Sequence, residues 1–265
     1  MCRKLIIVLI LLPTFCLAAF EVQSINTSSI ALGSITSLYI CSLNPAFLTE
    51  QKSMVMRVDY ARLYGLTGLD YYQAQLGWSS IKQKCFGLYL QNFGNTVYQE
   101  KTAGISYGQS LKNILSLGLT VHLYNIAIAG YQSSTTIGLS LGSVWNLSEQ
   151  MQIGLLFQNI NSPSIYKCSD PLPECFSLGA RYAPLSKMEV CGELFKDTEF
   201  PFSLRVGAII KPFDFMDLKF GTQINPDRYS GGISIYWKSL SVDFAFQHHQ
   251  TLPYTLYYGI GCGFK

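Results

Sequence analysis

The chain has 265 residues, of which only 13% are charged and 14% are aromatic. A soluble protein of this size normally carries about 25% charged residues, so this composition is not that of an ordinary soluble protein. No stretch after the N-terminal leader is an apolar run of about 18 residues, which excludes membrane-spanning helices. The net charge of +3 falls to +1 (17 basic against 16 acidic residues) without Arg3 and Lys4, which gives no reason to expect a nucleic-acid partner.

Residues 1–19 predict a signal peptide. The charged start is residues 3–4 and the apolar run is residues 5–12. The small residues 18–19 form the cleavage site, with the cut after Ala18 or Ala19. The apolar run is too short for a transmembrane helix, and Pro13 interrupts it. A lipoprotein acylated at Cys16 is the alternative, although the bulky residue before Cys16 disfavours it. We therefore expect an exported protein.

Residues 20–52 form a segment without regular alternation. Its apolar side chains need burial: Ile30, Leu32, Ile35 and Leu38. Asn44 can bond its own backbone and start a turn, and Pro45 fixes φ at the start of a helix. A disordered periplasmic tail is the alternative, but such tails are usually low in hydrophobicity.

Residues 53–265 alternate apolar residues with polar or small ones at a period of two. The stretch 114–124 shows this best, with one face made of Leu115, Leu117, Leu119, Val121 and Leu123 and the other of Ser116, Gly118, Thr120, His122 and Tyr124. Successive side chains of a strand point to opposite faces, so such a stretch is a strand with one apolar face. The pattern recurs about fourteen times in runs of about ten residues, the length that a tilted strand needs to cross a membrane.

This pattern predicts an all-β fold, a transmembrane antiparallel β-barrel in the outer membrane of a Gram-negative-type bacterium. The polar face cannot lie in lipid, because unpaired polar groups there are costly, so it must line a lumen. A soluble β-sandwich also alternates. A sandwich would place charges on its outer face, whereas here that face is mostly Gly, Ser, Gln and Thr.

The predicted connections differ in length. Turns near 81–83, 185–186, 212–214 and 239 are short, whereas the segment 160–174 is long. An even strand count places both termini in the periplasm, with the short turns on that side and 160–174 outside. The last strand ends in an apolar stretch that resembles the signal read by the barrel-insertion machinery, which we expect as a partner. Its signal residues are Tyr258, Ile260 and Phe264.

Two cysteines bracket the longest turn-rich segment. Cys168 and Cys175 are separated by Ser-Asp-Pro-Leu-Pro-Glu, a loop that can bring them together in an oxidising compartment, so we predict a disulfide. A metal site is the weaker alternative, because no histidine is near. Cys85, Cys191 and Cys262 lie inside predicted strands and are expected to act as small apolar residues.

The N-terminal segment carries two short motifs, Ala31-Leu32-Gly33 and Asn44-Pro45-Ala46. Together with the barrel of about fourteen strands that follows, they make the chain resemble the FadL-like superfamily, which includes fatty acid transporters and the PorV and PorQ proteins of type IX secretion. The resemblance implies that residues 20–52 fold inside the lumen as a plug. The short outer loops place the chain nearer the PorV and PorQ branch than the fatty acid transporters.

Charged residues on neighbouring strands are predicted to face the lumen as one cluster. They are Arg181, Glu189, Glu193, Arg205, Asp217 and Lys219. Their signs alternate across strands, so ion pairs between neighbours are expected. A network that holds the wall and the plug together is one interpretation, and a ligand or gating site is the other.

An enzyme is not expected. The histidines are His122, His248 and His249, with no Ser/His/Asp order and no Gly-x-Ser-x-Gly run, and they are too few to indicate a metal. We expect no cofactor.

Three functions remain open for a barrel in outer-membrane lipid. The main hypothesis, implied by the resemblance, is a secretion accessory of the PorV and PorQ type that binds secreted cargo or subunits of a secretion complex. The alternatives are a passive channel for a small hydrophobic ligand, by a kink or gap in the wall, and a structural barrel without transport.

Overall fold

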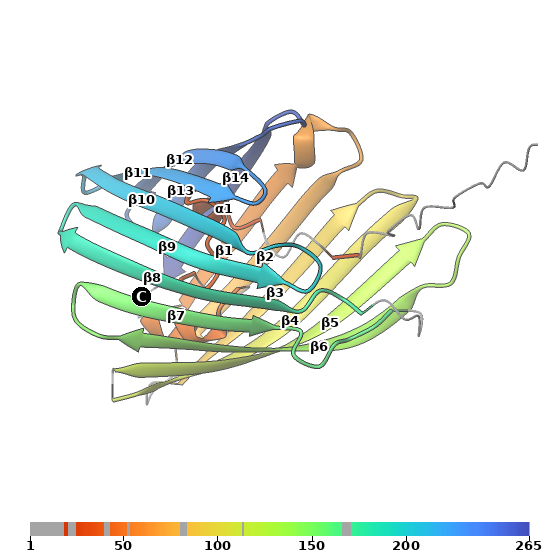
Figure 1. Cartoon of the computed structure of the whole chain (residues 1–265), viewed down its shortest axis with the longest axis horizontal. Coiled ribbons are helices and arrows are strands. Elements are labelled where there is room, and N and C mark those ends of the chain that lie inside the picture. The colour runs from red at the N-terminus through yellow and green to blue at the C-terminus, as the bar shows by residue number, and fades with distance from the viewer. Residues whose placement is uncertain are drawn as a thin grey trace, which may run out of the picture.

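A computed structural model describes residues 19–20, 25–39, 43–51, 54–79, 84–112, 114–165 and 171–264. Its strands form one closed barrel in which every strand pairs antiparallel with its neighbours in sequence (Figure 1). The strands are β1 (Met54–Arg62), β2 (Asp70–Ser79), β3 (Lys84–Gly94), β4 (Tyr98–Leu111), β5 (Leu115–Ile128), β6 (Ser134–Asn146), β7 (Met151–Gln158), β8 (Cys175–Leu185), β9 (Met188–Asp197), β10 (Ser203–Phe213), β11 (Met216–Ile224), β12 (Arg228–Trp237), β13 (Leu240–His249) and β14 (Thr255–Phe264). Three short helices accompany them: α1 (Thr27–Ala31), η1 (Pro45–Glu50) and η2 (Leu63–Gly65).

Pairing between β1 and β14 closes the barrel. The register runs from Met54 opposite Phe264 to Arg62 opposite Leu256, so no strand edge is left open. The predicted fourteen-stranded antiparallel barrel is confirmed, and the β-sandwich is excluded. The predicted insertion-signal residues Tyr258, Ile260 and Phe264 lie on β14 with exposed side chains.

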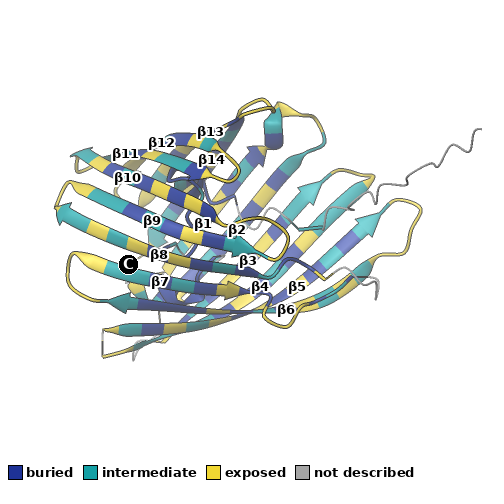
Figure 2. Ribbon diagram, viewed as in Figure 1, coloured by how far each residue is buried: buried dark blue, intermediate teal, exposed yellow. Residues whose placement is uncertain are grey.

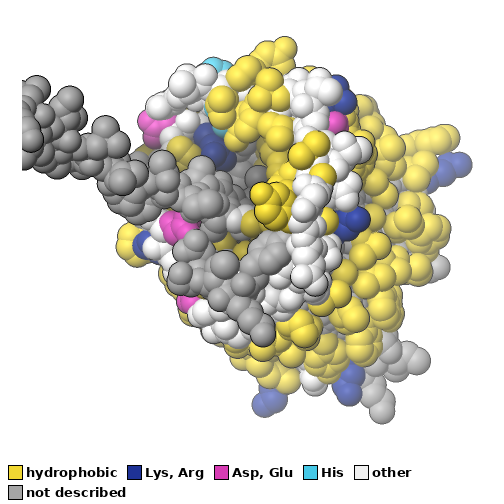
Figure 3. Space-filling view, turned by 90° about the vertical axis from the view of Figure 1, so that its right-hand side faces the viewer, with side chains coloured by type: hydrophobic (Ala, Val, Ile, Leu, Met, Phe, Trp, Pro, Cys, Tyr) yellow, Lys and Arg dark blue, Asp and Glu magenta, His cyan; other side chains and the backbone are white. Residues whose placement is uncertain are grey.

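The apolar face of each strand points outward. On β5, Ser116, Thr120 and His122 are buried, whereas Leu119 and Leu123 between and beside them are exposed. Buried and exposed bands alternate along the strands (Figure 2), and hydrophobic side chains cover the flank of the barrel (Figure 3). An apolar exterior around a closed barrel is the arrangement that lipid requires.

Among the helices of the described ranges, none is both long and apolar enough to cross a membrane.

The two ends of the barrel differ. At one end, which we call the turn end, two-residue turns at 186–187, 214–215 and 238–239 join the strands. At this same end β1 begins and β14 ends. At the other, the loop end, lie the connections 63–69, 159–174, 198–202 and 250–254. The asymmetry matches the expected short periplasmic turns and longer outer loops. The predicted turn at 81–83 and residues 166–170 of the long loop lie outside the described part of the chain.

The described residues of the N-terminal segment, 25–39 and 43–51, lie within the ring of strands (Figure 1). Leu32, Ile35 and Phe47 pack with inward side chains of the wall, including Val144 and Ile209, in one buried cluster. Hydrophobic residues that would otherwise meet water are therefore buried inside the lumen. Whether the segment closes the lumen as a plug stays a prediction at this point.

Glycines on the inner wall make room for this segment. A Cβ at Gly142 would overlap Asn44 Oδ1, and one at Gly221 would overlap the backbone of Leu32 and Gly33. The small inward residues that alternate with apolar ones in the sequence thus allow close backbone approach.

Candidate functional site

A cavity of ≈ 480 Å³ opens at the loop end, between α1 and the adjoining segment on one side and the wall on the other. Its wall comes mainly from β9, β10, β11, β13 and β14 and from the loops that join them. The apolar part of its lining includes Ile30, Leu43, Phe195, Phe200, Pro226 and Tyr257. The volume falls within the range of about 300–1,000 Å³ that is usual for pockets that bind small molecules. We call it the outer cavity.

A stacked pair forms one side of the outer cavity. The guanidinium carbon of Arg205 lies 3.8 Å from the centre of the Phe195 ring, and both side chains are more than nine-tenths buried. Such a cation–π contact holds both groups in a fixed orientation. Opposite, Tyr64 adopts a left-handed φ of 57°, donates its backbone N–H to Thr255 Oγ1 at 2.9 Å and packs edge-on against His249.

Glu193 fixes the N-terminal segment beneath the cavity. Its side chain is fully buried, and its two oxygens accept from the segment through Thr36 N at 2.8 Å, Thr36 Oγ1 at 3.0 Å, Ser37 N at 2.6 Å and Ser37 Oγ at 2.6 Å. Arg205 Nη1 donates to the same carboxylate at 3.0 Å and to the backbone oxygen of Ser34 at 2.6 Å. Charge-assisted bonds of this kind are roughly twice as strong as neutral ones.

A second set of charges holds α1. Asp59 accepts from the backbone N–H of Thr27 at 3.0 Å and from its hydroxyl at 2.7 Å. Arg57 lies 2.7 Å from both Asp59 and Asp243, and Lys219 lies 3.6 Å from Asp243. These buried charges are paired and bonded, as burial requires.

The six predicted lumen charges do not form one cluster. Glu193 pairs with Arg205 under the cavity, whereas Lys219 belongs to the group that holds α1. Arg181 lies 3.7 Å from Glu189, which also pairs with Lys211, near the turn end and partly in solvent. Asp217 accepts from the exposed Tyr236 hydroxyl at 2.8 Å. The expected pairing of opposite charges on adjacent strands holds for β8 with β9 and for β9 with β10, but the single cluster is wrong.

Arg57, Asp59 and Asp243 belong to this site but were not among the predicted lumen charges. The alternation of apolar and polar residues could have identified them, because all three occupy the polar face of their strands. Arg57 and Asp243 are far apart in the chain, and they meet because β1 and β13 both flank β14.

The two N-terminal motifs lie at the close contacts between the segment and the wall. Asn44 is fully buried, its side chain accepts from Ala46 N at 3.0 Å, and Pro45 begins η1. Gly33 has a φ of 80° and approaches the backbone of Thr222. Ala31 and Leu32 are buried against glycines of β10, β11 and β12.

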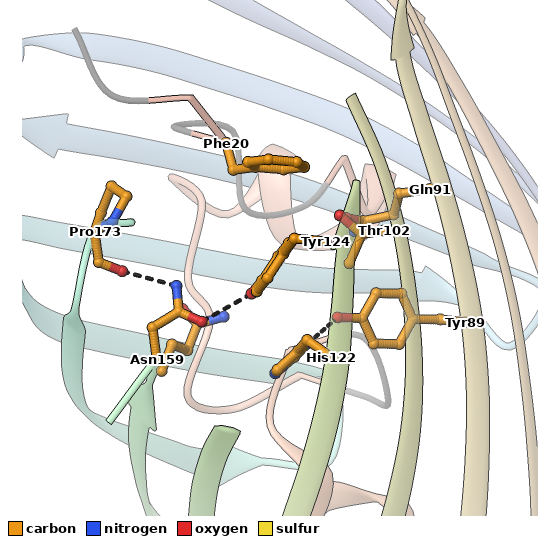
Figure 4. A pocket seen from close by; sticks show the side chains of 9 residues that line it. Phe20, Tyr89, Gln91, Thr102, His122, Tyr124, Asn159 and Pro173 are labelled. Carbon is orange, nitrogen blue, oxygen red and sulfur yellow. Dashed lines mark hydrogen bonds between the residues drawn. The ribbon is translucent and has the colours of Figure 1, made fainter. Parts of the chain in front are cut away.

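A second, much smaller pocket of ≈ 20 Å³ lies on the far side of Pro173, which lines both spaces. The Tyr124 hydroxyl donates to Asn159 Oδ1 at 2.9 Å, and Asn159 Nδ2 donates to the backbone oxygen of Pro173 at 2.9 Å (Figure 4). The Phe20 ring lies 5.0 Å from Tyr124. A pocket of this volume has room for about one water molecule, so these side chains close it. We call it the inner pocket.

The wall beside the inner pocket has an interrupted ladder. β5 pairs with β6 from Ser134 to Trp145, but β7 pairs with β6 only from Leu141 to Asn146 within the described residues. Beyond that point, loop residues bond to the β6 edge: Ile160 N donates to Leu139 O at 3.0 Å, and Asn161 Nδ2 donates to Ile137 O at 2.8 Å. Half of this edge is thus covered by a loop and not by a strand.

The cysteines and histidines have mainly packing roles. Cys85, Cys175 and Cys191 are buried. Cys168, and with it the predicted disulfide to Cys175, lies outside the described residues. His122 is buried between the Tyr89 hydroxyl and Ser140 Oγ, the latter at 2.7 Å. Within the described ranges, no group of His, Cys, Asp and Glu has the arrangement of a metal site.

Comparisons with known proteins rest on the fold. No family model and no curated protein sequence matches the chain. The Ralstonia pickettii toluene transporter TbuX has a TM-score of 0.69 at 12% identity, over 93% of this chain and 100% of that one. The P. putida toluene transporter TodX has a TM-score of 0.68 at 11% identity, over 92% and 99%. A Pseudomonas aeruginosa FadL homologue has a TM-score of 0.66 at 12% identity, over 91% and 98%.

Two of these neighbours are toluene transporters and the third is a FadL homologue, and their shared fold is the FadL-like barrel. The chain is an outer-membrane β-barrel of that fold, as its lipid-facing exterior requires. The resemblance to FadL-like barrels is confirmed at the level of fold. The narrower likeness to PorV and PorQ has no support among these structures.

Proposed function

We propose that this protein is a passive channel that takes small hydrophobic compounds from the cell surface into the outer membrane. The observation that carries the proposal is the outer cavity, whose apolar lining lies at the loop end and ends on a buried N-terminal segment. The solved structures with this fold include toluene transporters. These observations favour the channel over the secretion accessory that the sequence suggested first.

In this proposal residues 20–52 act as a plug. The described part of the segment is held by Glu193 on one side and by Asp59 on the other, and these bonded, buried side chains support a plug that would block a straight axial path. A compound in the outer cavity must therefore leave sideways.

The proposed lateral path runs past Pro173, which lines both the outer cavity and the inner pocket. Beyond the inner pocket lies the part of the β6 edge that the loop covers, where Asn161 replaces ladder partners. Opening here would break the bonds of Asn159 to Tyr124 and Pro173. An apolar compound would then enter lipid, where its transfer is favourable.

Uptake by whole cells tests the proposal, because they keep the asymmetric outer membrane. Cells that express the chain are expected to take up radiolabelled toluene faster than cells with the empty vector, at equal amounts of folded barrel on heat-modifiable gels. Equal initial rates would reject the channel. The secretion accessory would instead gain support if crosslinking recovered a secretion subunit from the same cells.

The variant Asn159→Gly tests the lateral path. Asn159 has a φ of 56°, which glycine adopts freely, so the change removes two side-chain bonds without straining the loop. We expect faster toluene uptake than in the wild type. Ser162→Gly is the matched control, because Ser162 also has a positive φ in the same loop but bonds to Glu174 and not to the inner pocket. Equal rates in the two variants would place the path elsewhere.

A further inference from the structure

Three residues that line the outer cavity have buried polar atoms that the protein leaves unbonded. Among the residues that the structure describes, Ser203 Oγ, Arg205 Nε and Gln223 Oε1 are buried without a hydrogen-bond partner, and all three side chains line the cavity. Ser203 and Arg205 are successive inward positions of β10, and Arg205 stands opposite Gln223 on β11. The three residues are thus neighbours in the wall, and we call their polar groups the polar corner.

The polar corner offers both kinds of hydrogen-bonding group. The Nε–H of Arg205 donates, the Gln223 amide oxygen accepts, and the Ser203 hydroxyl can do either. A ligand hydroxyl can accept from Arg205 and donate to Gln223 at the same time, whereas a hydrocarbon can do neither. Since buried polar groups without partners are costly, a ligand that bonds them gains affinity. The three rotatable side-chain bonds of Gln223 allow its amide to turn toward such a ligand.

The cation of the polar corner, Arg205, already has a counter-ion. Glu193 lies 3.0 Å from Arg205 and is fully buried, so the guanidinium has its counter-ion. The other guanidinium of the lining, Arg228, shares the cavity with the carboxylate of Asp197. A ligand carboxylate would place a further negative charge near the pair of Arg205 and Glu193 and would face the Gln223 oxygen with an acceptor. A neutral head group avoids both costs.

The surroundings of the polar corner suit a ring. The Phe195 ring stacks on Arg205 beside it, and Phe200, Pro226 and Tyr257 supply further apolar surface. Aromatic side chains and prolines pack well against a flat apolar ligand.

We propose that the outer cavity selects small apolar molecules that carry one neutral hydroxyl group, phenols above all, over hydrocarbons and carboxylates of the same shape. This rests on the proposed function, whose substrate class it narrows. The polar corner forms hydrogen bonds with the hydroxyl group, and the apolar wall packs against the rest of the molecule.

Equilibrium dialysis with the full chain in lipid nanodiscs tests the selectivity. The probes are p-cresol, toluene and p-toluate, which share one tolyl body, and uptake by protein-free nanodiscs is subtracted. We expect p-cresol to bind about tenfold more tightly than toluene, the effect of roughly one hydrogen bond to a charged or buried group. We expect p-toluate to bind more weakly than p-cresol.

Gln223→Leu and Ser203→Ala test whether the polar corner causes the preference. Both variants are expected to lose most of the difference between p-cresol and toluene, because the affinity for p-cresol falls while toluene, which forms no hydrogen bond there, still binds. Retained toluene binding also shows that each variant is folded. Gln75→Leu is the matched control, because Gln75 is another buried inward glutamine with an unbonded Oε1 but does not line the cavity. It should keep the wild-type preference.

The outcomes separate this inference from the proposed function. Toluene and p-cresol binding with equal affinity to the wild type would overturn the inference and leave the channel standing. Binding of neither compound would overturn both. The inference also fails if Gln223→Leu and Ser203→Ala behave like Gln75→Leu, or if they lose toluene binding together with p-cresol.

Discussion

The substitution Glu193→Gln should weaken the attachment of the N-terminal segment to the wall. The change keeps the size of the side chain but replaces one acceptor oxygen with a donor. If the amide oxygen takes the place of Oε2, the bonds from Thr36 N, Ser37 N and Ser37 Oγ survive. The new NH₂ group then faces Thr36 Oγ1, which can reverse its role, and Arg205, which cannot.

The smallest cost of this change is therefore the loss of the ion pair with Arg205. The two side chains are 0% and 8% exposed. Removing one partner from a buried pair costs about 3–5 kcal/mol. A loss of that size is a large share of the stability of a typical domain, about 5–15 kcal/mol.

Glu189→Gln is the control, on the same strand and the same face. Glu189 pairs with Arg181 and with Lys211, whose side chains are 36% and 34% exposed, so solvent screens both pairs. We expect at most about 1 kcal/mol for the loss of each pair. Urea unfolding in lipid, followed by gel mobility and fluorescence, gives both free energies. Limited proteolysis reports whether residues 25–51 become accessible. Equal losses of unfolding free energy in the two variants would contradict this prediction. So would full protection of the segment from proteolysis in Glu193→Gln.

Two further predictions concern the N-terminal segment and the residue at which it starts. Gly142→Ala should cost about 1–3 kcal/mol of unfolding free energy, because the added Cβ overlaps Asn44. Gly192→Ala should be near neutral, because its Cβ would meet only one backbone oxygen at 3.8 Å, and equal effects of the two variants in urea unfolding would contradict this. Mass spectrometry of the mature chain should find Phe20 at the N-terminus, as expected for signal-peptide cleavage after the small residue Ala19. The new ammonium group would then lie 3.1 Å from Glu100 Oε1 in the folded barrel. A terminus at Ala19 would count against this prediction.

The barrel itself could be predicted because alternation is a local property. On β5 each side chain between Leu115 and Tyr124 faces the side that the sequence predicts, since a period of two fixes the face whatever the neighbouring strand is. The pairing of Glu193 with Arg205 also followed from charges on adjacent strands. Both inferences needed only short-range information.

The candidate site could be predicted only in part, because it depends on register and closure. The charges that hold α1 meet only when β1 and β14 close the barrel, and the sequence does not show the register. The short ladder between β6 and β7 could not be predicted from the sequence either, because the side chain of Asn161 takes the place of backbone partners on a strand. The polar corner depends on Arg205 standing opposite Gln223, again a matter of register.

The central claim is that small hydrophobic compounds occupy the outer cavity on their way through the wall. Crystals of the protein soaked with bromobenzene test this directly, because the bromine atom gives an anomalous signal that marks each binding position. We expect an anomalous peak in the outer cavity, against Phe195, Ile30 and Tyr257. Peaks confined to the lipid-facing exterior of the barrel, with none in the cavity, would contradict it.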